Sequence, residues 1–281
     1  MFSAKSIHAF FLIKQPSSKR PPMRISIIQT DIHWEAPKQN LLSLENKLQE
    51  LAGTTDLVVL PETFSTGFSM QTEQTAEPMD GETMSTLRHF AATFQTALCG
   101  SFVAKDGGRY FNRAFFVHPH GETVHYDKRH LFRMGEENKH FAAGRERCIV
   151  PYMGWNICLM VCYDLRFPVW SRNVGNEYDL LIYVANWPHA RQHVWETLLS
   201  ARAIENVCFV CGANRIGKDN NGLAHHGGSQ LISPKGKIIA HAGNEAQILT
   251  ATIDRSEIET LRTKFPTWKD ADAFSLHETE E

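Results

Sequence analysis

The sequence Val-Cys-Tyr-Asp-Leu-Arg-Phe-Pro, residues 161–168, joins an apolar run to a segment of helical character. The run 156–161 is short and apolar, which is typical of a buried strand, and the pattern over 169–176 predicts a helix. A strand that leads directly into a helix must turn sharply, and a side chain at such a turn projects from the edge of the sheet. Cys162 occupies this position and is the first candidate nucleophile.

Two further short segments place ionisable side chains at comparable positions. Leu-Pro-Glu-Thr-Phe (60–64) ends the apolar run 56–60, and Tyr-Asp-Lys-Arg-His-Leu-Phe (126–132) follows another predicted strand. A cysteine attacks as the thiolate, so a catalytic thiol requires a neighbouring cation, a base or a helix N-terminus. Lys128 and Glu62 supply the first two, and a helix after Cys162 would supply the third.

These groups together predict acyl transfer through a covalent intermediate. Glu62 would take the thiol proton and later deprotonate a water molecule. Lys128 and the backbone N–H of Tyr163 would hold the oxyanion of a tetrahedral intermediate, and each such donor is worth on the order of 10²–10³ in rate.

The ordered motifs resemble those of the nitrilase superfamily of carbon–nitrogen hydrolases. The motifs are Pro-Glu-Thr-Phe (61–64), Tyr-Asp-Lys-Arg-His (126–130) and Val-Cys-Tyr-Asp-Leu-Arg-Phe (161–167). The resemblance maps the Glu-Lys-Cys triad of that superfamily onto Glu62, Lys128 and Cys162. It also implies an assisting glutamate, which its distance to Gly144 matches to Glu137, with Glu136 as the alternative.

The resemblance extends from about residue 24 to the C-terminal region and points to the bacterial omega-amidase branch. It rests on Lys-Arg-His-Leu-Phe-Arg-Met (128–134), Arg-Phe-Pro-Val-Trp-Ser-Arg-Asn (166–173), Tyr-Val-Ala-Asn-Trp-Pro (183–188), Ala-Arg-Ala-Ile-Glu-Asn (201–206) and Phe-Pro-Thr-Trp-Lys-Asp-Ala-Asp (265–272). That branch hydrolyses the terminal amide of 2-oxo acid monoamides such as 2-oxoglutaramate and 2-oxosuccinamate. The resemblance implies that no metal or organic cofactor is needed.

Four side chains are candidate substrate contacts because they flank the predicted strand ends. A guanidinium binds a carboxylate through two parallel hydrogen bonds, which makes Arg166 and Arg172 candidates for the carboxylate of a 2-oxo acid. Trp187 and Phe64 are candidates for the apolar walls around the carbon chain.

Other chemistries on the same triad remain open: hydrolysis of an N-carbamoyl amine, of a deaminated peptide amide or of a nitrile. A hypothesis of a different class is a catalytically silent binding or scaffold protein. Gly-Ala-Asn-Arg-Ile-Gly-Lys-Asp (212–219) nearly matches a phosphate-binding loop but ends in Asp where a hydroxyl is required, and a turn follows it. Fourteen histidines invite a metal site, yet no metalloenzyme spacing occurs.

Composition limits the partners and the compartment. Hydrophobic content of 42% and charged content of 21% are ordinary for a globular protein, and a net charge of -2 gives no electrostatic reason to expect nucleic acid. The six cysteines are spread through apolar segments of a large chain, which favours reduced thiols and a cytoplasmic location. Cys208 and Cys211 are expected to be buried strand residues rather than a redox pair.

The 281-residue chain has no linker, which favours one domain over 23–281. Residues 1–22 are expected to be a disordered extension, because their apolar stretch 9–13 is too short to cross a membrane. Met23 opens a strand abruptly and is a candidate for the physiological start.

Strands alternate with helices along the chain, with hairpins between them, which predicts an α/β fold with mixed sheets. Strands are expected at 24–29, 56–60, 97–104, 110–118, 122–126, 156–161, 179–184, 207–212, 228–233, 237–242 and 248–253. Helices are expected around Leu41–Leu51 and at 82–95, 169–176, 192–206 and 257–265. The resemblance implies the four-layer α-β-β-α sandwich of the nitrilase superfamily, whose members commonly form homodimers by pairing sheet to sheet.

Overall fold

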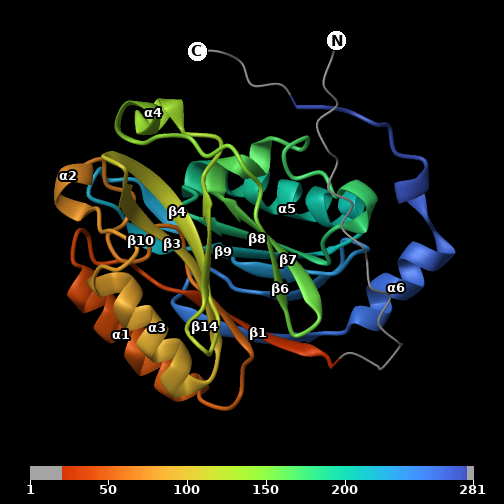
Figure 1. Cartoon of the computed structure of the whole chain (residues 1–281), viewed down its shortest axis with the longest axis horizontal. Helices are drawn as coiled ribbons and strands as arrows, with labels where there is room; N and C mark the ends of the chain where they lie inside the picture. Colours follow the sequence, from red (N-terminus) through yellow and green to blue (C-terminus); the bar gives the residue numbers. More distant parts are fainter. Residues whose placement is uncertain (1–20, 277–281) are drawn as a thin grey trace, which may run out of the picture.

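The chain folds into two six-stranded mixed sheets, and the computed structural model describes residues 21–276 (Figure 1). The predicted extension 1–22 lies outside these residues except for its last two. The first sheet has the order β14–β1–β2–β3–β4–β5. Its strands are β1 (Met23–Gln29), β2 (Leu57–Val59), β3 (Ala97–Asp106), β4 (Arg109–Val117), β5 (Thr123–Asp127) and β14 (Gln247–Ile253).

The second sheet has the order β13–β12–β9–β8–β7–β6, and β7, β8 and β9 are parallel at its centre. Its strands are β6 (Ile149–Tyr152), β7 (Trp155–Val161), β8 (Leu180–Ala185), β9 (Phe209–Asn214), β12 (Gln230–Ile232) and β13 (Ile238–His241). A separate two-stranded ribbon consists of β10 (Ile216–Lys218) and β11 (Ala224–His226).

Helices cover the outer faces of the two sheets. In Figure 1, α1 and α3 lie together on one outer side and α5 lies near the strands of the second sheet. The α-helices are α1 (Pro37–Leu51), α2 (Thr72–Thr75), α3 (Glu82–Phe94), α4 (Glu137–His140), α5 (Gln192–Asn206) and α6 (Arg255–Lys264). Short 3-10 helices are η1 (Arg133–Gly135), η2 (Cys162–Arg166), η3 (Val174–Asn176), η4 (His189–Arg191) and η5 (Thr267–Lys269).

Two apolar clusters hold these layers together. The larger cluster lies between the sheets and includes Ile25 and Val59 from the first, with Leu159 and Ile182 from the second. The smaller cluster packs Leu44 and its neighbours in α1 and α3 against the outer face of the first sheet. Burial of such side chains is the main favourable term in folding. The layers are therefore helix, sheet, sheet, helix, and the four-layer sandwich is confirmed.

Most predicted elements are confirmed, including the β-α-β opening and the hairpin of β4 and β5. The prediction of a helix over 169–176 is wrong, because the segment forms turns and ends in η3. Gly175 and Asn176 adopt positive φ angles of 62° and 60°. Asn173 Nδ2 also donates to the carbonyl of Tyr178 at 2.9 Å, and a side chain that bonds nearby backbone in this way competes with helix formation.

None of the helices between residues 21 and 276 combines the length and apolar composition that crossing a membrane requires. All six cysteines are free thiols. Cys208 is buried directly before β9 and Cys211 is buried within it, and burial raises the pKa of both thiols. Both are buried as predicted, although only Cys211 is a strand residue.

Candidate active site

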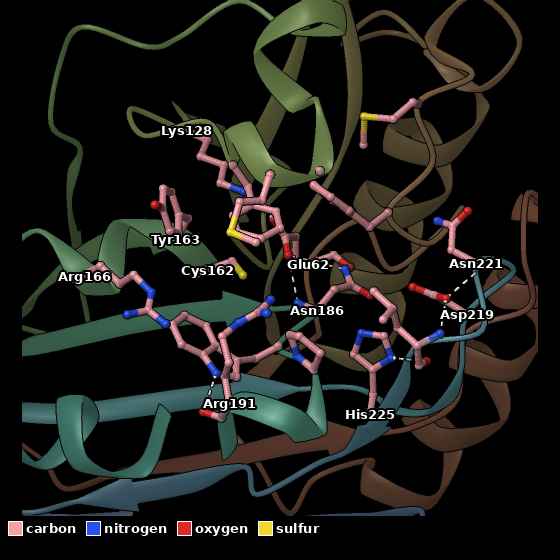
Figure 2. Close-up of a pocket in the computed structure, with 18 residues that line it drawn as sticks. Glu62, Lys128, Cys162, Tyr163, Arg166, Asn186, Arg191, Asp219, Asn221 and His225 are labelled. Atoms are coloured by element: carbon pink, nitrogen blue, oxygen red, sulfur yellow. Dashed lines mark hydrogen bonds and ion pairs between the residues drawn. The ribbon is translucent and has the colours of Figure 1, made fainter. Parts of the chain in front are cut away.

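Four loops at the carboxyl ends of strands converge on one cavity of about 150 Å³ (Figure 2). Glu62 follows β2 and Lys128 follows β5, both in the first sheet. Cys162 follows β7 and Asn186 follows β8, both in the second. Since β7 and β8 are parallel, their ends lie at one edge of the sheet. The structure therefore brings the three predicted triad residues together.

Lys128 lies between two buried carboxylates. Its Nζ is 2.8 Å from Glu62 Oε1 and 2.9 Å from Glu137 Oε2, and all three side chains are essentially inaccessible to solvent. Burial alone would lower the pKa of Lys128, but the carboxylates of Glu137 and Glu62 outweigh it and raise the pKa. The ammonium is thus held charged at the floor of the cavity.

The structure places Glu137 beside Lys128 and leaves Glu136 on the surface. Glu137 Oε2 also accepts from the backbone N–H of Phe132 at 2.6 Å, which fixes the loop before α4. Burial raises the pKa of Glu137, with Lys128 acting in the opposite direction. Glu136 instead pairs with the exposed Lys139 at 2.5 Å. Only Glu137 is placed to assist the chemistry.

Asn112, in the middle of β4, joins the two carboxylates and was not among the predicted residues. Its Nδ2 donates to Glu62 at 2.8 Å and to Glu137 at 3.0 Å. Its Oδ1 accepts from Ser101 in β3 at 3.0 Å, and Ser101 Oγ accepts from the backbone N–H of Thr63 at 2.8 Å. The neighbouring strands therefore position the glutamates through a continuous set of hydrogen bonds.

Cys162 lies in a strained turn with φ of 43°, a left-handed conformation that is uncommon for residues other than glycine. Asp164 closes this turn, because its Oδ2 accepts from the backbone N–H of Val161 at 3.0 Å. The same carboxylate accepts from the hydroxyl of Tyr126 at 2.8 Å and from the backbone N–H of His130 at 3.0 Å. Asp164 thereby ties the thiol turn to the loop that carries Lys128.

The electrostatics of the thiol differ from expectation. Burial and the carboxylate of Glu62 raise the pKa of Cys162 well above its ordinary value, while Lys128 acts in the opposite direction. The prediction that a helix N-terminus would favour the thiolate is wrong, because Cys162 itself begins the five-residue 3-10 helix η2 and no α-helix follows it directly. Burial and Glu62 outweigh Lys128, so the resting thiol keeps its proton.

Asn186 joins the two sheets at the site and was also missed. Its backbone N–H donates to Glu62 Oε2 at 2.7 Å, and its side-chain Nδ2 donates to the Glu62 carbonyl at 2.7 Å. The same backbone N–H acts to lower the pKa of Cys162, against the effect of burial. Figure 2 shows Asn186 next to Glu62, joined to it by a dashed line, with Cys162 on one side of both. Asn186 directly follows a predicted strand, and this position is the feature of the sequence that could have identified it as a site residue.

Three predicted residues lie in the cavity wall: Tyr163, Arg166 and Trp187. Tyr163 follows Cys162 in the turn, and its ring packs edge-on against Phe132 with centroids 5.1 Å apart. The guanidinium of Arg166 lies over the ring of Trp187, 5.2 Å from its centroid. The cavity also contains Arg191, Asp219 and His225, which were not among the predicted site residues.

Two predicted substrate contacts lie elsewhere. Phe64 is buried against Phe115 beneath the helices of the first sheet, with ring centroids 5.9 Å apart. The guanidinium of Arg172 donates to the backbone carbonyl of Glu205 at 2.9 Å, at the end of α5. Neither side chain lines the cavity, so the expectation that they flank it is wrong.

No three His, Cys, Asp or Glu side chains gather in a way that could hold a metal ion within residues 21–276. Burial lowers the pKa of His225 to about 4. At this pKa the imidazole is neutral at physiological pH. Its Nδ1 is 3.1 Å from the carbonyl oxygen of Leu223, which accepts the ring proton.

Known proteins share this fold and much of this sequence. The profile of the carbon–nitrogen hydrolase family matches residues 24–263. Omega-amidase YafV of Escherichia coli is 42% identical over 91% of this chain and 99% of its own length. The 2-oxoglutaramate amidase of Bacillus subtilis is 32% identical over 88% of this chain and 96% of its own length.

Solved structures agree with these relatives. A CN-hydrolase superfamily protein from Xanthomonas campestris, with an arsenic adduct in its active site, has a TM-score of 0.90 and 43% identity. It matches 92% of this chain and 100% of its own. A mutant amidase from Nesterenkonia sp., in which acrylamide has added to the active-site cysteine, has a TM-score of 0.76 and 25% identity, covering 87% of this chain and 98% of its own. The chain belongs to the carbon–nitrogen hydrolase family.

Proposed function

We propose that this protein hydrolyses the terminal amide of small 2-oxo acid monoamides, 2-oxoglutaramate and 2-oxosuccinamate, to the 2-oxo acid and ammonia. The observation that carries the proposal is the convergence of Glu62, Lys128 and Cys162 in one small cavity that also contains guanidinium groups. The relatives named as an omega-amidase and a 2-oxoglutaramate amidase support this substrate class, because each aligns over nearly its whole length.

In the first half-reaction, Cys162 Sγ bonds to the amide carbon while Glu62 takes the thiol proton. A neutral thiol beside a carboxylate suits this route, since proton removal and attack occur together. The carbonyl oxygen becomes an oxyanion held by Lys128 Nζ and by the backbone N–H of Tyr163. Glu62 then returns the proton to the leaving nitrogen, the carbon–nitrogen bond breaks, and ammonia departs from an acyl-thioester.

In the second half-reaction, water hydrolyses the thioester. Glu62 removes a proton from the water as its oxygen bonds to the acyl carbon, and the same oxyanion donors act again. The carbon–sulfur bond then breaks, and Glu62 returns its proton to the sulfur. One water is consumed and one ammonia is released in each cycle, and the free thiol is regenerated.

The remaining site residues would position these groups. Glu137 keeps Lys128 charged and aimed at the cavity, because it is the second carboxylate bound to the ammonium. Arg166 would bind the carboxylate of the 2-oxo acid, and the Trp187 ring beneath it would wall the carbon chain. The scheme requires no metal or organic cofactor.

The domain, assembly and location are also proposals. The apolar cluster shared by both sheets supports a single domain over 23–281. Membership of the family supports a homodimer, and the six free thiols support a cytoplasmic location.

A comparison of amides tests the substrate class. Ammonia release is measured with 2-oxoglutaramate and 2-oxosuccinamate, beside glutamine, asparagine, an N-carbamoyl amino acid and a nitrile. The proposal expects kcat/KM to be highest for the two 2-oxo acids. Faster turnover of the N-carbamoyl compound or the nitrile would assign a different substrate to the same triad, and no turnover with any compound would favour a binding protein.

A further inference from the structure

Within residues 21–276, two guanidinium groups in the cavity wall have no anionic partner. Arg166 lies over the ring of Trp187 and Arg191 lies over the ring of Phe132, with distances to the ring centroids of 5.2 Å and 5.3 Å. Neither guanidinium makes a hydrogen bond or ion pair with any residue of the described range 21–276. Elsewhere in the fold, Arg24, Arg113 and Arg262 each pair with an aspartate.

The backbone fixes Arg191 beside Arg166. Arg191 ends η4, where its N–H donates to the Pro188 carbonyl at 3.0 Å. Its own carbonyl accepts from Trp187 Nε1 at 2.9 Å, so the ring that supports Arg166 is bonded to the backbone of Arg191. Figure 2 shows the Arg191 side chain extending from η4 toward Cys162 and Asn186, with Arg166 on the same side of the cavity.

The carboxylates of the cavity do not neutralise this pair. Glu62 already accepts hydrogen bonds from Lys128, Asn112 and Asn186. Asp219 Oδ1 accepts from the backbone N–H groups of Asn221 and Leu223, both at 2.9 Å, and Figure 2 places it on the side away from Arg166. The wall formed by Arg166 and Arg191 is therefore positively charged and open to a bound anion.

We propose that Arg191 determines substrate specificity by binding the C1 carboxylate of the substrate together with Arg166. This inference rests on the proposed function and deepens it. A carboxylate has two oxygens, and a guanidinium on each side satisfies both while relieving the repulsion between the two cations. The aromatic faces hold the guanidinium planes in place before substrate arrives. The substrate is thereby selected for a carboxylate at the end opposite its amide.

A matched pair of substrates tests the role of Arg191. The compound 4-oxopentanamide is 2-oxoglutaramate with a methyl group in place of the C1 carboxylate. For Arg191→Gln we expect KM for 2-oxoglutaramate to rise roughly 10- to 100-fold with a smaller change in kcat. The kcat/KM for 4-oxopentanamide should change less than about twofold, because no charge is lost from that complex. The KM of Arg191→Lys for 2-oxoglutaramate should lie between those of the wild type and Arg191→Gln, since lysine keeps the positive charge but lacks the planar guanidinium fork.

The control variant is Arg172→Gln, because the Arg172 guanidinium lies outside the cavity. This variant should leave kcat/KM for both substrates unchanged. A general structural effect of Arg191→Gln would instead impair both substrates equally. If Arg191→Gln kept the wild-type preference for 2-oxoglutaramate, or lost activity on both compounds alike, the inference would be overturned.

A binding measurement separates this inference from the proposed function. Calorimetry on the Cys162→Ala variant measures the affinity for 2-oxoglutarate and for 4-oxopentanoate, an analogue with a methyl group in place of the C1 carboxylate. The inference expects tighter binding of 2-oxoglutarate and loss of that advantage when Arg191→Gln is added. Equal binding of the two acids to Cys162→Ala, or an advantage that survives Arg191→Gln, overturns it. Absence of 2-oxoglutaramate turnover by the wild-type enzyme would reject only the proposed function.

Discussion

Charged groups are paired at the floor of the cavity and unpaired in its guanidinium wall, within the part of the chain that the structure describes. At the floor, Lys128 is fully buried between Glu62 and Glu137, and both carboxylates accept further hydrogen bonds. In the wall, Arg166 and Arg191 lie over aromatic rings, and neither pairs with an anionic group of the part of the chain that the structure describes. The groups assigned to bond making are thus arranged before substrate binds, whereas the groups assigned to recognition obtain their partner from the substrate.

Removing the cation at the floor should have the largest effect. In Lys128→Met two buried carboxylates lose their shared partner, so we expect the free energy of unfolding to fall by roughly 3–5 kcal/mol. Turnover should fall about 10²–10³-fold with a much smaller change in KM, because an oxyanion donor acts in the transition state. Urea denaturation and steady-state kinetics measure the two effects.

The control for Lys128→Met is Lys139→Met, which removes a lysine that is 63% exposed. That variant should match the wild-type enzyme in both assays. A Lys128→Met protein that lost only affinity, with kcat unchanged, would contradict the oxyanion role.

The neighbouring glutamates give a smaller and more selective comparison. Glu137→Gln removes a buried charge beside Lys128, and we expect a loss of about 1–3 kcal/mol of stability together with a clear loss of kcat. Glu136→Gln changes a surface group and should stay within about 0.5 kcal/mol of wild type. Thermal unfolding and steady-state kinetics measure stability and kcat for both variants. Equal losses in Glu137→Gln and Glu136→Gln would contradict the assignment.

The pH dependence of the thiol tests the charge balance at the floor. Because burial and the carboxylate of Glu62 raise the pKa of Cys162, the thiol should stay protonated at neutral pH and ionise only above the ordinary cysteine value of about 8.5. The measurement is the ultraviolet absorbance of the thiolate, taken as the difference between wild type and Cys162→Ala during a pH titration. Glu62→Gln removes a negative charge and should move the midpoint to lower pH. A wild-type midpoint below pH 7 would show that Lys128 outweighs burial and the carboxylate of Glu62.

The smallest expected effect is that of added salt on substrate binding at the guanidinium wall. Arg166 and Arg191 are half-buried, so added salt should screen their attraction for a carboxylate more than it weakens the fully buried ion pairs. Raising NaCl from about 0.05 to 0.5 M should increase KM for 2-oxoglutaramate roughly two- to fivefold and leave kcat nearly constant. The KM for 4-oxopentanamide should not respond, and an equal response would argue against a charged recognition wall.

The sequence predicted the parts of the site that follow strands. Glu62 and Cys162 each come at the end of an apolar run, and Lys128 directly follows the predicted strand of a hairpin. Asn112 gave no comparable signal, because a single polar residue inside β4 does not reveal which groups it faces across the sheet. Asn186 followed a strand but lacked a charge that would have made it a candidate.

The wrong predictions have a common physical origin in local backbone geometry. Thr63 adopts φ of 43°, and Phe64 after it packs into the core rather than the cavity. The segment 169–176 contains enough apolar residues for a helix, but Gly175 and the side chain of Asn173 impose turns. Arg172 lies in that segment, and its guanidinium donates to the backbone carbonyl of Glu205 instead of lining the cavity.

The most direct test of the account is detection of an acyl group on Cys162. The wild-type enzyme is mixed with excess 2-oxoglutaramate, quenched in acid during turnover, and analysed by intact-protein and peptide mass spectrometry. The account predicts a mass increase equal to the substrate less ammonia, located on the peptide that contains Cys162 and absent from Cys162→Ala. Sustained ammonia release by Cys162→Ala, or an acyl group found only on another residue, would contradict it.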